Sequence, residues 1–232
     1  MTESMDQQLD RIRRAYDLTV EQYRKGIDPL IEVPEEFKNS PKFKALIEDA
    51  DLYCGSGAPE NRAYLDPKPG MRFLDAGCSA NLANHLLGLW PSIYYGVDVS
   101  PALIEALRGF VAHHQIPIGG LYVADIADLP FDDSFFDIAD VIGVLEYCTL
   151  EYVKDALFEL NRVLRPEGRM VVDIPNLEHP LVQTMFQLEQ YLGRPNFPHP
   201  RRAFEETLTP LFAIERTDDS HVMLKYLVRA IK

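Results

Sequence analysis

The chain has 232 residues, of which 47% are hydrophobic and 25% charged, and this balance excludes a disordered chain and a small disulfide-stapled protein. Lys and Arg number 23 and Asp and Glu number 36, so the net charge of −13 opposes binding to nucleic acids and to anionic membrane surfaces. The apolar runs are too short for a membrane span and the three cysteines are scattered. We therefore expect a cytoplasmic protein with no membrane insertion, no nucleic-acid partner and no metal site.

The first 66 residues differ from the rest of the chain. They are mainly polar and helical in pattern, with a loop expected at residues 54–57. We expect residues 1–66 to form a helical cap or lid and residues 67–232 to form the core domain. Three prolines fall within residues 195–200, so a surface loop is expected there. Residues 175–209 as a whole are expected to cover the substrate.

Short apolar runs alternate with amphipathic stretches from residue 73 onward, which is typical of strand and helix units that build a parallel sheet. The expected strands are 72–75, 93–97, 121–124, 136–142, 170–174, 212–216 and 222–231. The expected helices are 82–89, 101–113, 151–164, 180–192 and 203–208. A turn is expected at 165–168 and a hairpin turn at 218–220. The fold class is therefore α/β, a doubly wound sheet of seven strands, mostly parallel, with a C-terminal antiparallel hairpin strand.

Three consecutive strands end in aspartate, at Asp75, Asp98 and Asp125. Ligands of open α/β sheets bind outside the carboxyl ends of the strands. A turn through Gly77 lets backbone approach a ligand closely, because glycine has no Cβ. A carboxylate accepts from both hydroxyls of a ribose, which suits Asp98, and the carboxylate of Asp125 can accept from an exocyclic amine. Together these residues outline an adenosine site.

A dinucleotide site would require the pattern Gly-x-Gly-x-x-Gly, in which the later glycines allow contact with a pyrophosphate. The corresponding positions here are Gly77, Ser79 and Leu82, so two of the three glycines are absent. This disfavours a nicotinamide-dependent oxidoreductase.

Five segments resemble, in order, the motifs of one enzyme family. They are 73–78, 95–100, 124–131, 136–140 with 144–147, and 159–168. The family is that of the class I S-adenosylmethionine-dependent methyltransferases, and the resemblance is greatest to the small-molecule subgroup that includes ubiquinone and menaquinone biosynthesis methyltransferases (methyltransferase type 11). The resemblance implies a Rossmann-like fold and transfer of a methyl group from S-adenosylmethionine to a small-molecule acceptor, with S-adenosylhomocysteine as product.

The resemblance also implies which residues hold the cofactor. The turn after the first strand would hold the methionine part, Asp98 the ribose and Asp125 the adenine, and backbone near Gly143 would face the sulfonium. An aromatic residue of the N-terminal helix would pack nearby. The residues assigned to the cofactor are Tyr23, Asp75, Gly77, Cys78, Ser79, Asn81, Asp98, Val99, Asp125, Ile126, Ile142 and Gly143.

The first motif departs from the family pattern Gly-x-Gly-x-Gly. This chain has Ser79 and Asn81 at the second and third glycine positions. Serine is small and asparagine tolerates a positive φ, so we expect the turn to be kept. The departure leaves open a methyltransferase-like protein that binds the cofactor without catalysis. An arsenite methyltransferase, suggested by Cys54 and Cys148, is disfavoured because that family's cysteine would lie nearer Gly143.

Methyl transfer is an in-line displacement, for which orientation and exclusion of water supply much of the rate. A hydroxyl or carbon acid as acceptor also needs a base. The candidates are Glu146 and Tyr147 after the fourth expected strand, and His179 and His199 in the covering segment. Aromatic residues in the covering segments suggest a ring-bearing or apolar acceptor.

Overall fold

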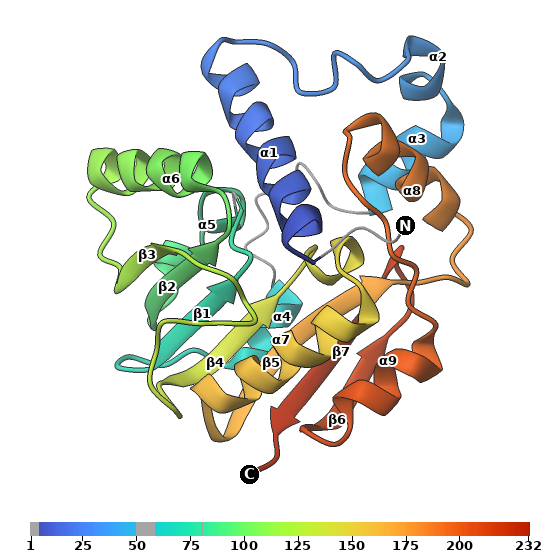
Figure 1. Cartoon of the computed structure of the whole chain (residues 1–232). Helices are drawn as coiled ribbons and strands as arrows, with labels where there is room; N and C mark the ends of the chain where they lie inside the picture. The colour runs from blue at the N-terminus through green and yellow to red at the C-terminus, as the bar shows by residue number, and fades with distance from the viewer. Residues whose placement is uncertain (1–4, 50–58, 80) are drawn as a thin grey trace.

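The computed structural model describes residues 5–49, 59–79 and 81–232. Its centre is a seven-stranded sheet in the order β3-β2-β1-β4-β5-β7-β6 (Figure 1). The strands are β1 (Arg72–Ala76), β2 (Ile93–Asp98), β3 (Gly120–Val123), β4 (Phe136–Val141), β5 (Leu164–Pro175), β6 (Phe212–Asp218) and β7 (Met223–Ala230). Neighbouring strands from β3 to β5 pair in parallel, and β7 runs antiparallel between β5 and β6. The expected fold class is confirmed.

Helices cover both faces of the sheet and its carboxyl edge (Figure 1). They are α1 (Met5–Arg24), α2 (Glu35–Lys38), α3 (Pro41–Asp49), α4 (Pro59–Leu65), α5 (Asn81–Asn84), α6 (Pro101–His114), α7 (Leu150–Val163), α8 (Val182–Tyr191) and α9 (Arg201–Leu208), with 3-10 turns η1 (Leu87–Leu89) and η2 (Leu145–Tyr147). The start of α6 follows from its sequence, because Ser100 accepts a hydrogen bond from the Leu103 amide at 3.0 Å and Pro101 takes the first helical position.

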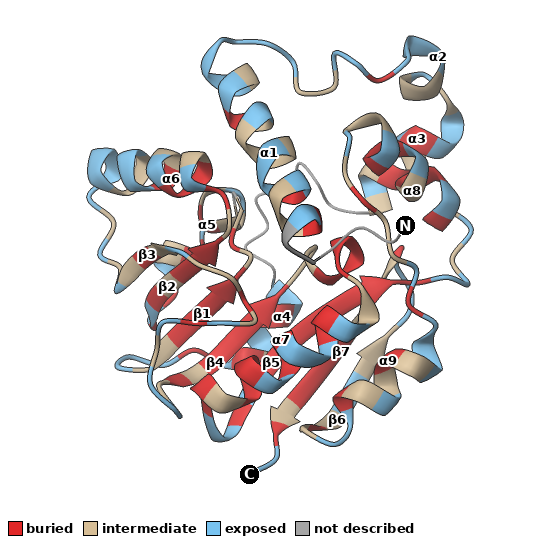
Figure 2. Cartoon of the chain, viewed as in Figure 1, coloured by how far each residue is buried: buried red, intermediate tan, exposed pale blue. Residues whose placement is uncertain are grey.

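Successive residues of each strand point to opposite faces, and this alternation divides the apolar core in two. Phe73 packs with Ile104 of α6 on one face, whereas Leu74 packs with Leu157 of α7 on the other. Figure 2 shows that buried residues fill the central strands, while α1 is mostly intermediate or exposed. No helix of the described ranges is long and apolar enough to cross a membrane.

A third apolar cluster joins the N-terminal region to the segment after β5. Phe43 and Leu46 of α3 pack with Val182, Met185 and Leu188 of α8. The expected lid and the expected covering segment therefore contact each other beside the start of β7. The division of the chain at residues 66 and 67 stays a prediction, and the expected loop at 54–57 lies outside the described residues.

Two expected elements were wrong. The helix expected at 82–89 is divided into α5 and η1, because Leu86 adopts a left-handed backbone conformation with φ of 54°. The turn expected at 165–168 lies inside β5, as an irregularity between the pairs Phe136–Leu164 and Ile138–Arg169. The other strand bounds agree with the expected ones within two residues.

Candidate functional site

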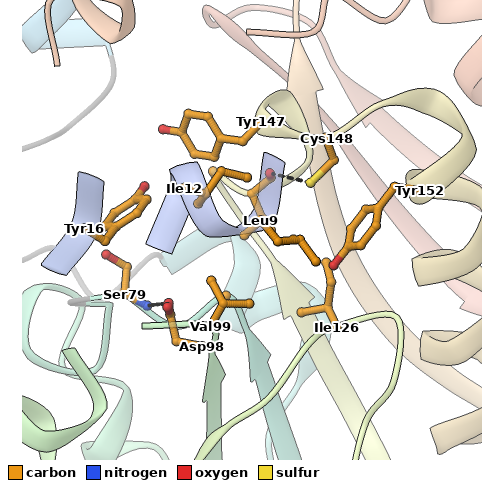
Figure 3. A pocket seen from close by; sticks show the side chains of 13 residues that line it. Leu9, Ile12, Tyr16, Ser79, Asp98, Val99, Ile126, Tyr147, Cys148 and Tyr152 are labelled. Atoms are coloured by element: carbon orange, nitrogen blue, oxygen red, sulfur yellow. Dashed lines mark hydrogen bonds between the residues drawn. The ribbon is translucent and has the colours of Figure 1, made fainter. Parts of the chain in front are cut away.

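A cavity lies at the carboxyl ends of the central strands, beneath α1 (Figure 3). It encloses about 480 Å³ of unfilled space, part of which is open to solvent. Its lining residues are Leu9, Ile12, Tyr16, Gly77, Ser79, Asp98, Val99, Ile126, Gly143, Val144, Tyr147, Cys148 and Tyr152. Figure 3 shows the side chains of α1 between the strand ends on one side and Tyr147, Cys148 and Tyr152 on the other.

The turn after β1 forms one wall of the cavity. The amides of Gly77 and Cys78 both donate to the Val97 carbonyl at 2.8 Å. Gly77 has φ of 76°, and a Cβ there would lie 2.3 Å from Cγ2 of Val144, so only glycine fits. The turn is kept, but the residue with a positive φ is not the expected one. Ser79, with φ of 38°, takes the left-handed conformation, whereas Asn81 begins α5. Ala80 lies outside the described residues.

Asp98 ends β2 at the cavity wall. Its carboxylate accepts from the Ser79 amide at 3.0 Å and from the Ser100 amide at 2.9 Å, and it is 7% exposed. The Ser100 hydroxyl donates to Asp17 of α1 at 2.5 Å. Burial raises the pKa of Asp98, and the nearby Asp17 carboxylate raises it further. A buried carboxylate is thus held beside α1.

Asp125 and Ile126 follow β3, and they face different spaces. Ile126 lines the main cavity, whereas Asp125 lines a shallower depression beside it together with Arg13 of α1. The Asp125 carboxylate accepts from the Ala127 amide at 2.8 Å and from the Tyr152 hydroxyl. Asp125 therefore lies at the outer rim of the cavity.

A row of three buried carboxyl groups, Asp75, Asp140 and Asp173, lies behind the cavity on neighbouring strands. Asp75 accepts from the Tyr94 hydroxyl at 2.7 Å, and it shares a hydrogen bond with Asp140. Asp173 accepts from the Gly143 amide at 2.9 Å. Burial raises the pKa of Asp75 and of Asp173 to about 6, and burial with the neighbouring Asp75 raises that of Asp140 well above its usual range.

Asp140 and Asp173 were missed by the sequence reasoning, although a signal existed. Both stand inside apolar strands, where a charged residue requires a partner. Cys78 and Ile142, which were assigned to the cofactor, have side chains in the apolar cluster on the α6 face, so only their backbone is near the cavity.

A second group of ionisable residues borders the cavity at η2. Tyr147 donates to Glu189 of α8 at 3.1 Å, and Arg194 lies 3.2 Å from the same carboxylate. The Arg194 guanidinium stacks 4.5 Å from the ring centroid of Tyr16, whose edge meets Tyr147. Burial raises the pKa of Tyr16 to about 12 and raises that of Tyr147 as well. Both tyrosines therefore stay neutral, and Tyr147 is a hydrogen-bond donor rather than a base.

Glu146 lies beside this group and is 5% exposed. Its Oε2 has no hydrogen-bond partner within the described ranges. Burial and the nearby Asp173 raise the pKa of Glu146 well above its usual range, and Arg194 partly offsets this. A Cβ at Gly143 would lie 3.7 Å from Oε1 of Glu146. Because Gly143 lines the cavity and has no side chain, the Glu146 carboxyl is adjacent to the cavity wall.

The structure does not bring His179, His199 or Tyr23 into the cavity lining. His199 is 3% exposed and its Nε2 contacts the Leu145 carbonyl at 3.1 Å, so it supports η2. His179 accepts from the Leu181 amide at 3.3 Å and lies near Asp49. Tyr23 is 78% exposed, because the turn of α1 that meets the cavity is the one that carries Tyr16, two turns earlier.

Residues 74–172 match the family model described as methyltransferase domain. The match covers less than half of the chain. The match spans the turn after β1, Asp98, Asp125 and η2, so all cofactor-side walls of the cavity except α1 fall inside it. The resemblance inferred from the sequence motifs is confirmed.

Curated relatives match about half of the chain. The O-methyltransferase cnsE of Penicillium expansum is 31% identical over 119 residues, 50% of this chain and 42% of that protein. A tRNA (carboxymethyluridine(34)-5-O)-methyltransferase of Arabidopsis thaliana is 34% identical over 50% of this chain and 27% of that protein. Demethylmenaquinone methyltransferase of Corynebacterium kroppenstedtii is 30% identical over 48% of this chain and 44% of that protein. The chain thus spans less than half the length of each of these relatives.

A solved structure of similar fold covers nearly the whole chain. Magnesium protoporphyrin IX methyltransferase from Synechocystis PCC 6803, with bound S-adenosylmethionine, superposes with a TM-score of 0.67 and 13% identity. The superposition covers 99% of this chain and 100% of that chain. At this identity the likeness establishes the fold, including the helices outside residues 74–172.

Proposed function

We propose that this chain transfers a methyl group from S-adenosylmethionine to a small-molecule acceptor. The observation that carries the proposal is the position of the Gly77 turn and the buried Asp98 carboxylate in the wall of one cavity, inside the residues that match the methyltransferase domain. Relatives that act on a quinone precursor and a porphyrin support a small molecule as acceptor.

The residues present fit this cofactor. The absent Cβ of Gly77 leaves backbone at the cavity wall, and Asp98 keeps acceptor capacity for a ribose diol beyond its two backbone donors. Val99 and Ile126 offer apolar contact to the adenosine, with Asp125 at the rim. The methionine part would lie along the turn from Gly77 to Asn81 above Asp75, with the backbone of Gly143 toward the sulfonium.

The cofactor, when bound, supplies a methyl group on a cationic sulfur that leaves as a neutral thioether. The chain's own residues orient and shield this centre. Leu9, Ile12 and Tyr16 of α1 cover the cavity and exclude water, which strengthens the electrostatic interactions inside it. Tyr147, held by Glu189, supplies an aromatic wall on the acceptor side.

Glu146 is the base that this arrangement favours. Burial and the nearby Asp173 raise its pKa well above the usual carboxyl range, which makes its carboxylate a stronger proton acceptor than an ordinary one. An acceptor hydroxyl would form its new bond to carbon through an oxygen lone pair and pass its proton to Oε2 of Glu146. The Arg194 guanidinium beside Glu146 favours the anion that develops on the acceptor.

The proposal is tested by calorimetric titration with S-adenosylmethionine, S-adenosylhomocysteine and NADH. We expect micromolar binding of the first two and none of NADH, with affinities lowered about ten- to hundredfold in Asp98→Asn, since a charge-assisted hydrogen bond is lost. Asp155→Asn on the exposed side of α7 is the matched control. Absence of binding to either sulfur ligand would contradict the proposal.

The acceptor class is tested separately with cofactor that carries a labelled methyl group. The panel contains phenols, enols and amines, with transfer RNA as a comparison. Label in a small molecule supports the proposal, and label only in RNA contradicts its acceptor class. Cofactor binding without transfer to any acceptor would favour a non-catalytic binding protein. The cytoplasmic location and the absence of a nucleic-acid partner stay predictions.

A further inference from the structure

The carboxyl row (Asp75, Asp140 and Asp173) follows from the register of the sheet. Asp75 of β1 lies directly opposite Asp140 of β4, and Val171 of β5 is opposite Asp140, so Asp173 stands two residues farther toward the carboxyl edge. Side chains alternate between the two faces along each strand, so Asp75 points to the same face as Phe73. The register places the Asp140 and Asp173 side chains on that face as well. They are 0%, 4% and 2% exposed. Three carboxyl groups thus stand on three adjacent strands with almost no access to water.

The row adjoins the cavity at two points. Asp173 accepts from the amide of Gly143, so its carboxylate is one peptide group behind the cavity lining. Asp75 precedes Gly77, the other lining glycine, by two residues, and its Oδ1 lies 3.4 Å from the side-chain amide of Asn81. In the middle of the row, Oδ1 of Asp140 is buried and has no hydrogen-bond partner among the residues that the structure describes.

The charges around the row do not balance. Lys225 of β7 stands opposite Asp173 and is the cation that acts on it. The groups that face Asp75 are the neutral Tyr94 and Asn81, together with Asp140. The Asp98 carboxylate adds a further negative charge near Asp75. The carboxyl groups of Glu146, which lies on η2, and Asp173, which lies on β5, repel each other. Lys225, together with Arg194 on the Glu146 side, therefore faces several carboxyl groups in a region of low dielectric constant.

We propose that the carboxyl row makes the cavity select its ligand by charge, binding the cationic S-adenosylmethionine in preference to the neutral S-adenosylhomocysteine. Asp173 exerts the charge directly behind Gly143, and Asp140 holds Asp75 in place by the hydrogen bond that the two share. The carboxyl row would therefore act in ligand specificity and in product release. Methyl transfer removes the positive charge of the sulfonium, and this weakens the attraction between the bound product and the carboxyl row. The inference rests on the proposed function.

The test measures the ratio of the two dissociation constants by calorimetry, so that it does not depend on turnover. In Asp173→Asn the side-chain oxygen can still accept from Gly143, but the charge is gone. We expect affinity for S-adenosylmethionine to fall about tenfold and affinity for S-adenosylhomocysteine to change less than about twofold, since one unit charge across a buried wall has an effect of this order on a cation. Sinefungin, which carries an ammonium group in place of the methylsulfonium, should follow S-adenosylmethionine.

Lys225→Gln supplies the opposite change. Removal of the cation that faces Asp173 should raise the affinity for S-adenosylmethionine several-fold relative to the affinity for S-adenosylhomocysteine. Simple damage to the fold does not produce a change in this direction. Asp155→Asn removes one exposed charge of the same sign as Asp173 and should leave the ratio unchanged. Circular dichroism and thermal unfolding establish that each variant is folded.

The outcomes separate this inference from the proposed function. If the wild type binds neither sulfur ligand, both fail. If the wild type binds both ligands and Asp173→Asn weakens them equally, or shifts the ratio no more than Asp155→Asn, the charge selection is overturned while the proposed function stands. Opposite shifts in Asp173→Asn and Lys225→Gln support it.

Discussion

The two sides of the cavity are built in different ways. The cofactor side consists of the turn after β1 and the residues that end β2 and β3, and its polar contacts run between backbone amides and a carboxylate such as Asp98. The acceptor side consists of η2, α8 and residues 194–199. It depends on long-range side-chain contacts, such as Tyr147 with Glu189 and Arg194 with Tyr16. A side made of backbone contacts is fixed by local sequence, whereas a side made of side-chain contacts depends on residues that are far apart in the sequence.

Gly77→Ala is expected to have the largest effect, because it affects backbone on the cofactor side. The new Cβ would meet Val144 at 2.3 Å at a φ of 76°. We expect a loss of about 4 kcal/mol in the free energy of unfolding and no measurable cofactor binding. Chemical denaturation and calorimetry are the measurements.

Gly109→Ala in α6 is the control for that substitution. No atom lies within 4 Å of a Cβ at Gly109 and its φ is not positive, so alanine should stabilise the helix by about 0.5–1 kcal/mol. Cofactor affinity in Gly77→Ala close to that of Gly109→Ala would show that the turn does not contact the cofactor.

Glu146→Gln changes the acceptor side alone. We expect kcat to fall about 100-fold, since a general base contributes an effect of this order, while cofactor affinity stays within about twofold. In the wild type, kcat should fall as the pH decreases through the raised pKa of Glu146, above the usual carboxyl range, because the protonated form cannot accept a proton. This decrease should be absent from the pH profile of Glu146→Gln. An unchanged kcat in the variant would mean that the acceptor needs no base.

Arg194→Met tests whether side chains hold the acceptor side together. The side chains of Arg194 and Glu189 are 14% and 11% exposed, so removal of the cation leaves a buried carboxylate with the neutral Tyr147 as its donor and no cation to pair with. We expect a loss of about 3 kcal/mol in stability, measured by denaturation. Arg202→Met is the matched control, since the Arg202 side chain is 91% exposed beside Glu206, and its loss should cost less than about 0.5 kcal/mol. Equal losses in both variants would contradict a structural role for Arg194.

The same contrast explains which parts of the site could be predicted from the sequence alone. The sequence could place Gly77, Asp98 and Asp125 at one edge of the sheet, because each ends or follows a strand and the strand ends of a parallel sheet meet at one edge. The sequence analysis assigns Tyr23 to the cofactor, whereas Tyr16 lines the cavity, since spacing within a helix does not reveal which turn meets the sheet. Arg194 was missed, because its partners are in α1 and α8 and no local pattern connects them.

The histidine candidates show the same limit. His199 has the residue type of a base, but its ring contacts the Leu145 carbonyl and supports η2 instead. The orientation of a side chain in an irregular segment depends on tertiary packing. Asp140 and Asp173 are different, since a carboxylate inside an apolar strand was visible in the sequence as a residue that needs an explanation.

Asp140→Asn is expected to have the smallest effect, and its sign depends on pH. The folded pKa of Asp140 lies well above that of the unfolded chain, so between pH 4 and the raised value the folded state binds the extra proton and stability decreases as the pH rises. Asparagine removes this dependence and can still donate to Asp75. We therefore expect Asp140→Asn to be more stable than the wild type by about 1–2 kcal/mol at pH 8, with the difference vanishing near pH 4. Thermal unfolding of both proteins across this range measures it. A difference that does not change with pH would mean that Asp140 is not the group that binds the proton, and that the middle of the carboxyl row is charged in the folded protein.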